Sequence, residues 1–266
     1  MLNALTRICE LESFDVSSIR ALPYGGSAIA PQSLARAFDV FGEVLVQVYG
    51  LSEALVPLAA LAPAAHRHEK GRPLPARLSS AGRISPFVEL RIIGEDGSDL
   101  PRGETGEVTV RADTVMAGYW KRSDLTAEMI DAQGWARTGD LGFVDDEGYL
   151  HIVDRKKDVI VSGGFNVYPA EVERVIAALP EVSEVVVVGV PNERWGEAVK
   201  AVVVVRPGFE LDAEQVIDEC RKHLAGYKKP VEVEFVDSLP KTSTGKILRR
   251  ELRNRHWSGK DRKVGQ

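Results

Sequence analysis

The run of residues 135–169 contains three kinds of group that could hold a phosphorylated ligand. Asp140 follows a Thr-Gly pair, and an aspartate accepts hydrogen bonds from vicinal hydroxyls such as those of a ribose. Arg155, with two lysines directly after it, offers a planar fork that fits a phosphate. Gly163 and Gly164 let the backbone pass close to a ligand or turn sharply. We therefore predict a nucleotide site beside a movable joint; two solvated β-hairpins with a charged turn are the alternative.

Two glycine turns nearer the start of the chain point to the same kind of site. One is Tyr24-Gly25-Gly26-Ser27; the other, Gly50-Leu51-Ser52-Glu53, follows a buried strand expected over residues 43–49. Strand, glycine turn and helix in succession are typical of an α/β sheet, in which ligands lie at the carboxyl ends of the strands. Taken alone, Glu53 is better explained as an acid at a helix N-terminus, where the helix dipole favours it.

The segment from Pro240 to Lys246 looks at first like a phosphate-binding loop. The Walker pattern requires Gly five residues before the Gly-Lys pair and Ser or Thr after it. Those places hold Pro240 and Ile247, which excludes this class of loop. A lone ammonium group on a flexible loop suits a charge that must arrive and leave; a solvated lysine is the alternative.

The hydrophobic pattern predicts the elements that position these groups. We expect an N-terminal helix and link up to about residue 20, a short strand over 19–22, and a helix over 31–41 with Pro31 in its first turn. Residues 57–80 are interpreted as a loop, and residues 66–69 (His-Arg-His-Glu) as surface because zinc-ligand spacing is missing. Residues 82–154 have a β pattern, including strands over 88–93 and 107–112 and a hairpin over 142–153.

The remainder of the chain has a compact α+β pattern. A helix is expected from Pro169, with Pro in its first turn. Val-rich strands follow over 181–190 and 199–206. A second helix is expected to be capped by Asp212, and a third strand covers 231–236.

Composition limits the class of protein. The chain has 266 residues, 44% hydrophobic and 27% charged, with a net charge of -5. No apolar run has membrane-spanning length, the N-terminus is not a signal peptide, and Cys9 and Cys220 fit a reducing, cytoplasmic location. From Lys241 onward nine Lys or Arg face two acids. Without aromatic interleaving or zinc-finger spacing, we expect a solvated helix near an anionic ligand and no nucleic-acid partner.

Six short sequence motifs follow one another along the chain: YGG, YGLSE, TGDLG, DRKKD, SGGFNVYPAEVE and PKTSTGK. In this order they resemble the adenylate-forming superfamily of acyl-CoA synthetases, peptide-synthetase adenylation domains and luciferases, over nearly the whole chain. The resemblance implies a multidomain α/β and α+β fold. Its expected parts are a partial α/β subdomain (1–75), a small β-barrel subdomain (76–153) and a C-terminal α+β lid domain (154–266).

The resemblance also implies roles for individual residues. Lys246 would be the mobile catalytic lysine, which neutralises charge developing on the α-phosphate. Glu53 would bind Mg2+, and Ser52 would keep the hydroxyl of the family's usual threonine, so both join Lys246 as catalytic residues. The expected nucleotide contacts are Gly25, Gly26, Ser27, Tyr49, Gly50, Asp140, Ile152 and Arg155.

Further positions follow from the same resemblance. Lys157 would be the hinge, and Gly163, Gly164 and Phe165 would contact coenzyme A. The turn at residues 195–197 also matches the family, and either ligand contact or hairpin packing explains it.

The implied activity is that of an ATP-dependent acid–CoA ligase of the medium- or long-chain fatty-acid type, which forms an acyl-adenylate and then the acyl-CoA. The expected ligands are a fatty or other carboxylic acid, ATP/AMP, Mg2+ and coenzyme A. An acid-adenylating enzyme that loads a carrier protein, and a non-catalytic nucleotide- or CoA-binding module, are the alternatives.

The family's phosphate-binding loop, a Ser/Thr/Gly-rich run ending in Lys, does not occur in this sequence. The chain therefore resembles the C-terminal half of an adenylating enzyme, and its isolated activity is expected to be absent or impaired. A partial large domain would expose sheet edge and apolar surface, so we expect either self-association or pairing with an N-terminal half.

Overall fold

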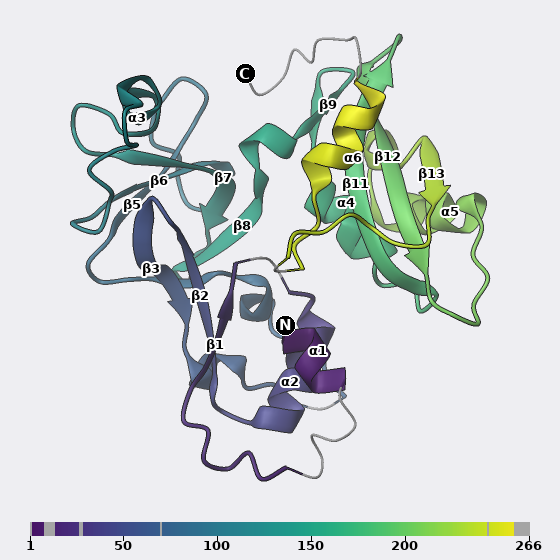
Figure 1. Ribbon diagram of the computed structural model, residues 1–266, viewed down its shortest axis with the longest axis horizontal. Coiled ribbons are helices and arrows are strands. Elements are labelled where there is room, and N and C mark those ends of the chain that lie inside the picture. Colours follow the sequence, from purple (N-terminus) through teal and green to yellow (C-terminus); the bar gives the residue numbers. More distant parts are fainter. Residues whose placement is uncertain (1, 8–13, 27–28, 70, 244, 258–266) are drawn as a thin grey trace. The chain divides into compact units, whose positions relative to one another are not determined.

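The computed structural model describes residues 2–7, 14–26, 29–69, 71–243 and 245–257, and Figure 1 shows its ribbon. The chain divides into two compact units, residues 1–152 and 153–266, and the division falls inside one β-strand. The fold is mixed α/β, as the sequence predicts, and each unit has its own sheet and core. Among the described residues, no helix is both long and apolar enough to cross a bilayer.

The first unit is built on one eight-stranded sheet with the strand order β1-β2-β3-β4-β8-β7-β6-β5. β1 and β2 are parallel, whereas β2–β3, β3–β4, β4–β8, β5–β6 and β6–β7 are antiparallel. The elements are α1 (Leu2–Arg7), β1 (Leu22–Gly25), α2 (Pro31–Phe41), β2 (Leu45–Leu51), β3 (Ala54–Leu61), η2 (Pro63–His66), η3 (Ala76–Ser79), β4 (Gly82–Ile84), β5 (Glu89–Ile93), β6 (Gly106–Arg111), α3 (Ser123–Met129), β7 (Ala136–Val144) and β8 (Tyr149–Arg155).

The short strand β4 joins the two sequence halves of this unit into a single sheet. Ile84 pairs with Ala59 of β3, and Gly82 pairs with Leu150 of β8. β1 and β5 are the two ends of the order, so the described strands form an open sheet. The described strands do not close into a barrel, and the predicted small β-barrel subdomain over residues 76–153 stays a prediction. The period-2 pattern identified the strands, but it carries no information about which strands pair.

The region between β1 and η3 corrects two predicted boundaries. β1 begins at Leu22 rather than Ile19. β3 runs from Ala54 to Leu61, through a stretch expected to be loop, and includes Pro57. Its pairing with β2 shifts register between Tyr49 and Leu51. This irregularity accommodates Pro57, because proline has no N–H to donate to a neighbouring strand.

His66 was expected on the surface, but it is fully buried. Its Nε2 lies 2.8 Å from the Tyr24 hydroxyl and its Nδ1 lies 2.9 Å from the carbonyl oxygen of Ala62. Both ring nitrogens thus have partners, and burial lowers the pKa of the imidazole. The described residues contain no group of three acidic, His or Cys side chains that could hold a metal. His66 is a core residue.

The second unit contains a sheet of five strands in the order β10-β9-β12-β11, with β13 added in parallel to β12. The Val-rich strands, both helices and the third strand expected from the sequence are present. The elements are η4 (Lys156–Asp158), β9 (Ile160–Ser162), β10 (Phe165–Val167), α4 (Pro169–Ile176), β11 (Val182–Asn192), β12 (Gly196–Val205), α5 (Ala213–His223), η5 (Gly226–Lys228), β13 (Glu232–Phe235) and α6 (Arg249–His256).

Both faces of the β11–β12 hairpin are covered. Val187 and Val199 point to the face packed against α4 and α5, where Val172 and Val216 lie. The alternate residues, among them Val186, Val188 and Val202, pack with Leu252 of α6 on the other face. Figure 1 shows α6 lying over β11. A strand buried on both faces needs apolar residues at every position, which explains the unbroken Val run.

The predicted cap at Asp212 is confirmed. Asp212 accepts a hydrogen bond from the Gln215 backbone N–H at 2.8 Å, and the Gln215 side chain accepts one from the Asp212 N–H at 2.9 Å. This reciprocal capping box satisfies two donors at the start of α5. The helix in turn places Val216 and Cys220 in the core.

We predict that Asp212→Ala lowers the free energy of unfolding by about 1 kcal/mol, since the cap accounts for roughly that amount. Glu210→Ala is the matched control, because Glu210 is exposed and lies outside the capping box. Thermal unfolding of both variants measures the effect. Equal melting temperatures for the two variants would contradict it.

Candidate functional site

The two glycine motifs lie at the same end of the parallel pair β1–β2. Gly25, the last residue of β1, pairs with Val48, and β2 continues through Gly50 to Leu51, so Gly50 lies in the strand and not in a turn after it. β1 and β2 approach so closely there that a Cβ on Gly25 would lie 2.2 Å from the carbonyl oxygen of Val48. Only glycine fits this position. Gly26, Tyr49 and Gly50 continue along the same edge, whereas Ser27 lies outside the described residues.

Asp140 lies in an irregular part of β7. Between the pairs Glu107–Leu141 and Thr109–Arg137, β7 has more residues than β6, so the segment 138–140 bulges out of the ladder. The Asp140 side chain is buried and accepts a hydrogen bond from the Tyr49 hydroxyl at 2.7 Å. The structure therefore brings together two predicted nucleotide residues that are 91 positions apart.

The carboxylate of Asp140 can accept more than one hydrogen bond. A carboxylate offers about four acceptor sites on two oxygens, so it can also accept from a pair of hydroxyls. The Asp140 N–H is held by Thr138 Oγ1 at 3.1 Å, and Thr138 Oγ1 in turn donates to the Val108 carbonyl at 2.7 Å. These bonds fix the bulge, and with it the direction of the carboxylate.

Ser52 and Glu53 form the tight turn between β2 and β3. Glu53 is therefore not at a helix N-terminus, and that explanation is wrong. Its Oε1 accepts a hydrogen bond from the Tyr119 hydroxyl at 2.9 Å, and its carbonyl accepts one from the Met116 N–H at 2.8 Å. Ser52 is exposed, and Glu53 is partly exposed. Carboxylate and hydroxyl are thus presented together on a turn.

Ile152 and Arg155 both belong to β8, at the division of the chain. Ile152 packs against the core of the first unit, so its role there is at least structural. Arg155 is exposed, and its N–H donates to Asp154 Oδ1 at 2.7 Å. Asp154 is buried, and its Oδ2 accepts from the Ala170 N–H at 2.8 Å in the first turn of α4.

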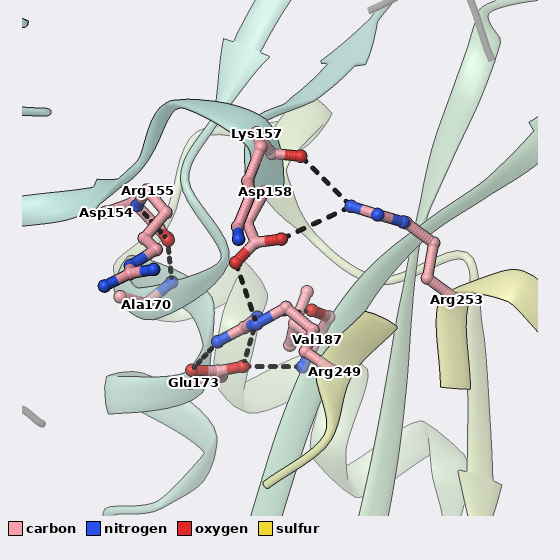
Figure 2. A network of polar contacts seen from close by, with 9 residues as sticks. All are labelled: Asp154, Arg155, Lys157, Asp158, Ala170, Glu173, Val187, Arg249 and Arg253. Carbon is pink, nitrogen blue, oxygen red and sulfur yellow. Dashed lines mark hydrogen bonds and ion pairs between the residues drawn. The ribbon is translucent and has the colours of Figure 1, made fainter. Parts of the chain in front are cut away.

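The expected hinge residue Lys157 lies in the short helix η4, and its side chain is exposed. Its carbonyl oxygen accepts a hydrogen bond from Arg253 Nη1 at 3.0 Å. The same nitrogen lies 3.3 Å from Asp158 Oδ1. Figure 2 shows these contacts between η4 and α6. The backbone directly after Lys157 is thus held by the C-terminal helix.

Gly163 and Gly164 form a two-residue turn between β9 and β10. Both have positive φ, 59° and 85°, which the tight turns of hairpins require. The Gly163 N–H donates to the Trp195 carbonyl at 2.9 Å, so the Trp195 turn lies beside it. Phe165 is 57% exposed and stacks on Tyr227 at 4.8 Å between ring centroids. An exposed backbone turn is therefore bordered by exposed aromatic rings.

Within the turn at residues 195–197, Glu197 is buried and serves hairpin packing, whereas Trp195 remains 40% exposed. Hairpin packing is thus present in this turn, whereas ligand contact at Trp195 stays a prediction.

Lys246 is exposed near the tip of a small hairpin rather than on an unstructured loop. Lys241 pairs with Ile247, and the Thr242 N–H donates to the Lys246 carbonyl at 2.8 Å. Ile247 packs into the core beside α6. The backbone of Lys246 is therefore fixed on both sides while its side chain extends into solvent.

Sequence reasoning missed three contributors to these sites. Tyr119 contacts Glu53, Tyr227 stacks on Phe165, and Arg253 contacts the carbonyl of Lys157. The aromatic residues of the stretch Gly118-Tyr119-Trp120 could have been singled out from the sequence. No pattern connects Arg253 with a residue 96 positions away.

Comparison with known proteins supports a single family. Residues 1–120 match the model of the AMP-binding enzyme family, and residues 171–246 match that of the AMP-binding enzyme C-terminal domain. Feruloyl-CoA synthase of an Amycolatopsis species is 45% identical over 91% of this chain and 48% of its own length. A fatty acid–[acyl-carrier-protein] ligase of Streptomyces coeruleorubidus is 42% identical over 94% of this chain and 47% of its own length. A long-chain-fatty-acid–CoA ligase of Escherichia coli is 42% identical over 96% of this chain and 43% of its own length.

Solved structures agree with these matches. The amide bond synthetase McbA of Marinactinospora thermotolerans has a TM-score of 0.86 and 40% identity, over 95% of this chain and 50% of that one. ATP-bound MatB of Rhodopseudomonas palustris has a TM-score of 0.79 and 34% identity, over 89% of this chain and 45% of that one. The o-succinylbenzoate CoA synthetase of Bacillus subtilis was solved in complex with its acyl-adenylate intermediate. It has a TM-score of 0.80 and 32% identity, over 100% of this chain and 50% of that one. The chain spans about half the length of the curated relatives it matches, and it belongs to the adenylate-forming superfamily.

Proposed function

We propose that the protein acts in ATP-dependent ligation of a carboxylic acid to coenzyme A, with a medium- or long-chain fatty acid as the acid. The observation that carries this proposal is the pairing of Tyr49 with Asp140 beside the glycine edge of β1 and β2. An aromatic ring, a fixed carboxylate and a side-chain-free backbone are what an adenosine moiety requires. The ATP-bound and acyl-adenylate-bound relatives support the nucleotide as ligand.

In the first step the acid's carboxylate oxygen attacks the α-phosphorus of ATP, and pyrophosphate leaves. Asp140 would accept hydrogen bonds from the ribose hydroxyls, and Arg155 would contact ribose or phosphate. Lys246 would neutralise charge that grows on the phosphate oxygens in the transition state. In the second step the thiol of coenzyme A attacks the acyl carbon, AMP leaves, and the thioester forms. The turn at Gly163 and Gly164, with Phe165, would contact the incoming thiol cofactor.

Glu53 fits a magnesium ion that is carried in by the nucleotide. Tyr119 contacts Oε1, and the carboxylate has a second oxygen. Mg2+ is usually held by one or two carboxylates together with substrate phosphates, so a single glutamate on a partly exposed turn suits it. When bound, the ion would screen the phosphate charges. Ser52 would place its hydroxyl near the same phosphates.

Delivery of the acyl group to a carrier protein is the second candidate. The relative from Streptomyces coeruleorubidus, a fatty acid–[acyl-carrier-protein] ligase, favours it. Both candidates share the adenylation step and differ in the thiol acceptor. In either case Lys157 would be the hinge about which the C-terminal unit moves between the steps.

We predict that the protein, combined with an N-terminal half that supplies the phosphate-binding loop, releases AMP when ATP, Mg2+, a fatty acid and coenzyme A are supplied together. Acyl-CoA detected by chromatography identifies coenzyme A as the acceptor. Acyl transfer to a phosphopantetheinyl carrier protein, with none to coenzyme A, would identify the second candidate. Nucleotide binding without AMP release would leave a binding module and contradict both.

We predict that Asp140→Ala weakens AMP binding at least about 10-fold, because hydrogen bonds to a charged group contribute roughly 1.5–3 kcal/mol. Tyr49→Phe is the matched control: it removes the hydroxyl that contacts Asp140 but keeps the ring, so the loss should be smaller. Titration calorimetry measures both, alongside thermal unfolding to check the fold. Unchanged affinity in Asp140→Ala would contradict the ribose role.

We predict that Lys246→Ala, tested in the protein combined with an N-terminal half, lowers acyl-adenylate formation about 100-fold or more, the scale seen when a group that stabilises transition-state charge is removed. Thioester formation from supplied acyl-adenylate should change less than about 3-fold, since Lys246 has no part in that step. Lys241→Ala is the control, because Lys241 lies on the same hairpin but pairs with Glu184 at 2.6 Å. Equal loss in both half-reactions would contradict the assignment.

A further inference from the structure

Arg249 and Arg253 lie on one side of α6, four residues apart and therefore one helical turn apart. Arg249 is the first residue of this helix and follows Lys246 by only three positions. Any contact that fixes the start of α6 therefore also fixes the base of the Lys246 hairpin. Leu248 reinforces this connection, because its N–H donates to the Pro240 carbonyl at 2.8 Å across the hairpin.

The Arg249 guanidinium lies between three acceptors from three other elements (Figure 2). Its Nη1 lies 2.7 Å from Glu173 Oε1 of α4 and donates to the Val187 carbonyl of β11 at 2.6 Å. Its Nε lies 3.8 Å from Asp158 Oδ2 in η4. Burial disfavours the charge, but Glu173, Asp154 and Asp158 outweigh it, so the pKa of Arg249 is raised and the group stays charged.

Arg253 extends the contact to the expected hinge. It donates to the Lys157 carbonyl at 3.0 Å and approaches Asp158 at 3.3 Å. The peptide group after Lys157 is therefore held by α6. The other end of this segment is held by α4, through the bond from Ala170 to Asp154. Helix α4 also provides Glu173, so α4, η4 and the start of α6 form one connected set of polar contacts.

We propose that Arg249 and Arg253 are positioning residues for Lys246: they hold the Lys246 hairpin in a fixed relation to the hinge at Lys157. Rotation at the hinge then delivers the ammonium group to a defined place. The inference rests on the proposed function, because only a two-step reaction gives Lys246 a step of its own. Arg249 and Arg253 do not contact the substrate in this account.

Arg253→Ala is the most informative variant, because Arg253 contacts a backbone carbonyl and an acid that Arg249 also approaches. We expect acyl-adenylate formation to fall about 10- to 100-fold, since a displacement of about 1 Å can cost 100-fold. Thioester formation from supplied acyl-adenylate should stay within about 3-fold of the wild type. Arg253→Lys, which can still donate to the Lys157 carbonyl, should recover part of the lost rate.

Arg255→Ala is the matched control. Arg255 lies on the same helix, is exposed, and pairs with Glu251 within that helix at 2.9 Å. Both half-reactions should stay close to the wild type in this variant. Arg249→Ala leaves the Glu173 carboxylate without its guanidinium partner and can fail to fold. Arg249→Lys, with its fold checked by thermal unfolding, tests that position instead.

A double-mutant cycle separates positioning from a general structural role. If Arg253 acts through Lys246, Arg253→Ala adds no further loss of adenylation in the Lys246→Ala background. Additive losses, or equal loss in both half-reactions, would overturn the inference while leaving the proposed function intact. A wild-type protein that forms no acyl-adenylate even when combined with an N-terminal half that supplies the phosphate-binding loop would overturn the proposed function, and the inference with it.

Discussion

The second unit depends on the burial of one guanidinium group. Arg249 lies among Glu173, Asp158 and the Val187 carbonyl, and a charge withdrawn from water must be paired or it destabilises the fold. The three acceptors belong to α4, η4 and β11. Satisfying this one cation therefore fixes the start of α6 against three other elements. The two-faced apolar sheet provides stability, whereas this polar contact determines the position of the C-terminal helix.

In the first unit, the candidate site residues are positioned by irregularities in the sheet. Asp140 points to Tyr49 because β7 bulges at residues 138–140. Ser52 and Glu53 are presented because β2 turns directly into β3. Gly25 allows β1 to lie against Val48 at a distance that no side chain tolerates. In each case the ladder is broken where a functional group is needed, which is the usual role of bulges near sites.

The sequence predicted those features that local physics determines. Asp212 followed by Gln215 specifies a capping box, Pro31 and Pro169 fit first helical turns, and the Val-rich runs specify strands. Pairing was not predictable, because the period of a strand does not name its partner. No sequence pattern indicated that the short strand β4 connects β3 with β8 in one sheet. His66 was misjudged for a related reason: its burial depends on Tyr24, 42 positions away.

The same distinction explains what the sequence could say about Lys246. The motif identifies the residue, but it suggested a flexible loop, whereas the structure has a paired hairpin with Ile247 in the core. The backbone hydrogen bond from Thr242 to Lys246 and the bridge between Lys241 and Ile247 restrict local motion of this lysine. Under the proposed two-step reaction, its arrival and departure would come from movement of the C-terminal unit as a body. The long-range contacts of Arg249 and Arg253 would then serve this movement as well as stability. They connect the Lys246 hairpin to the segment about which the unit would turn.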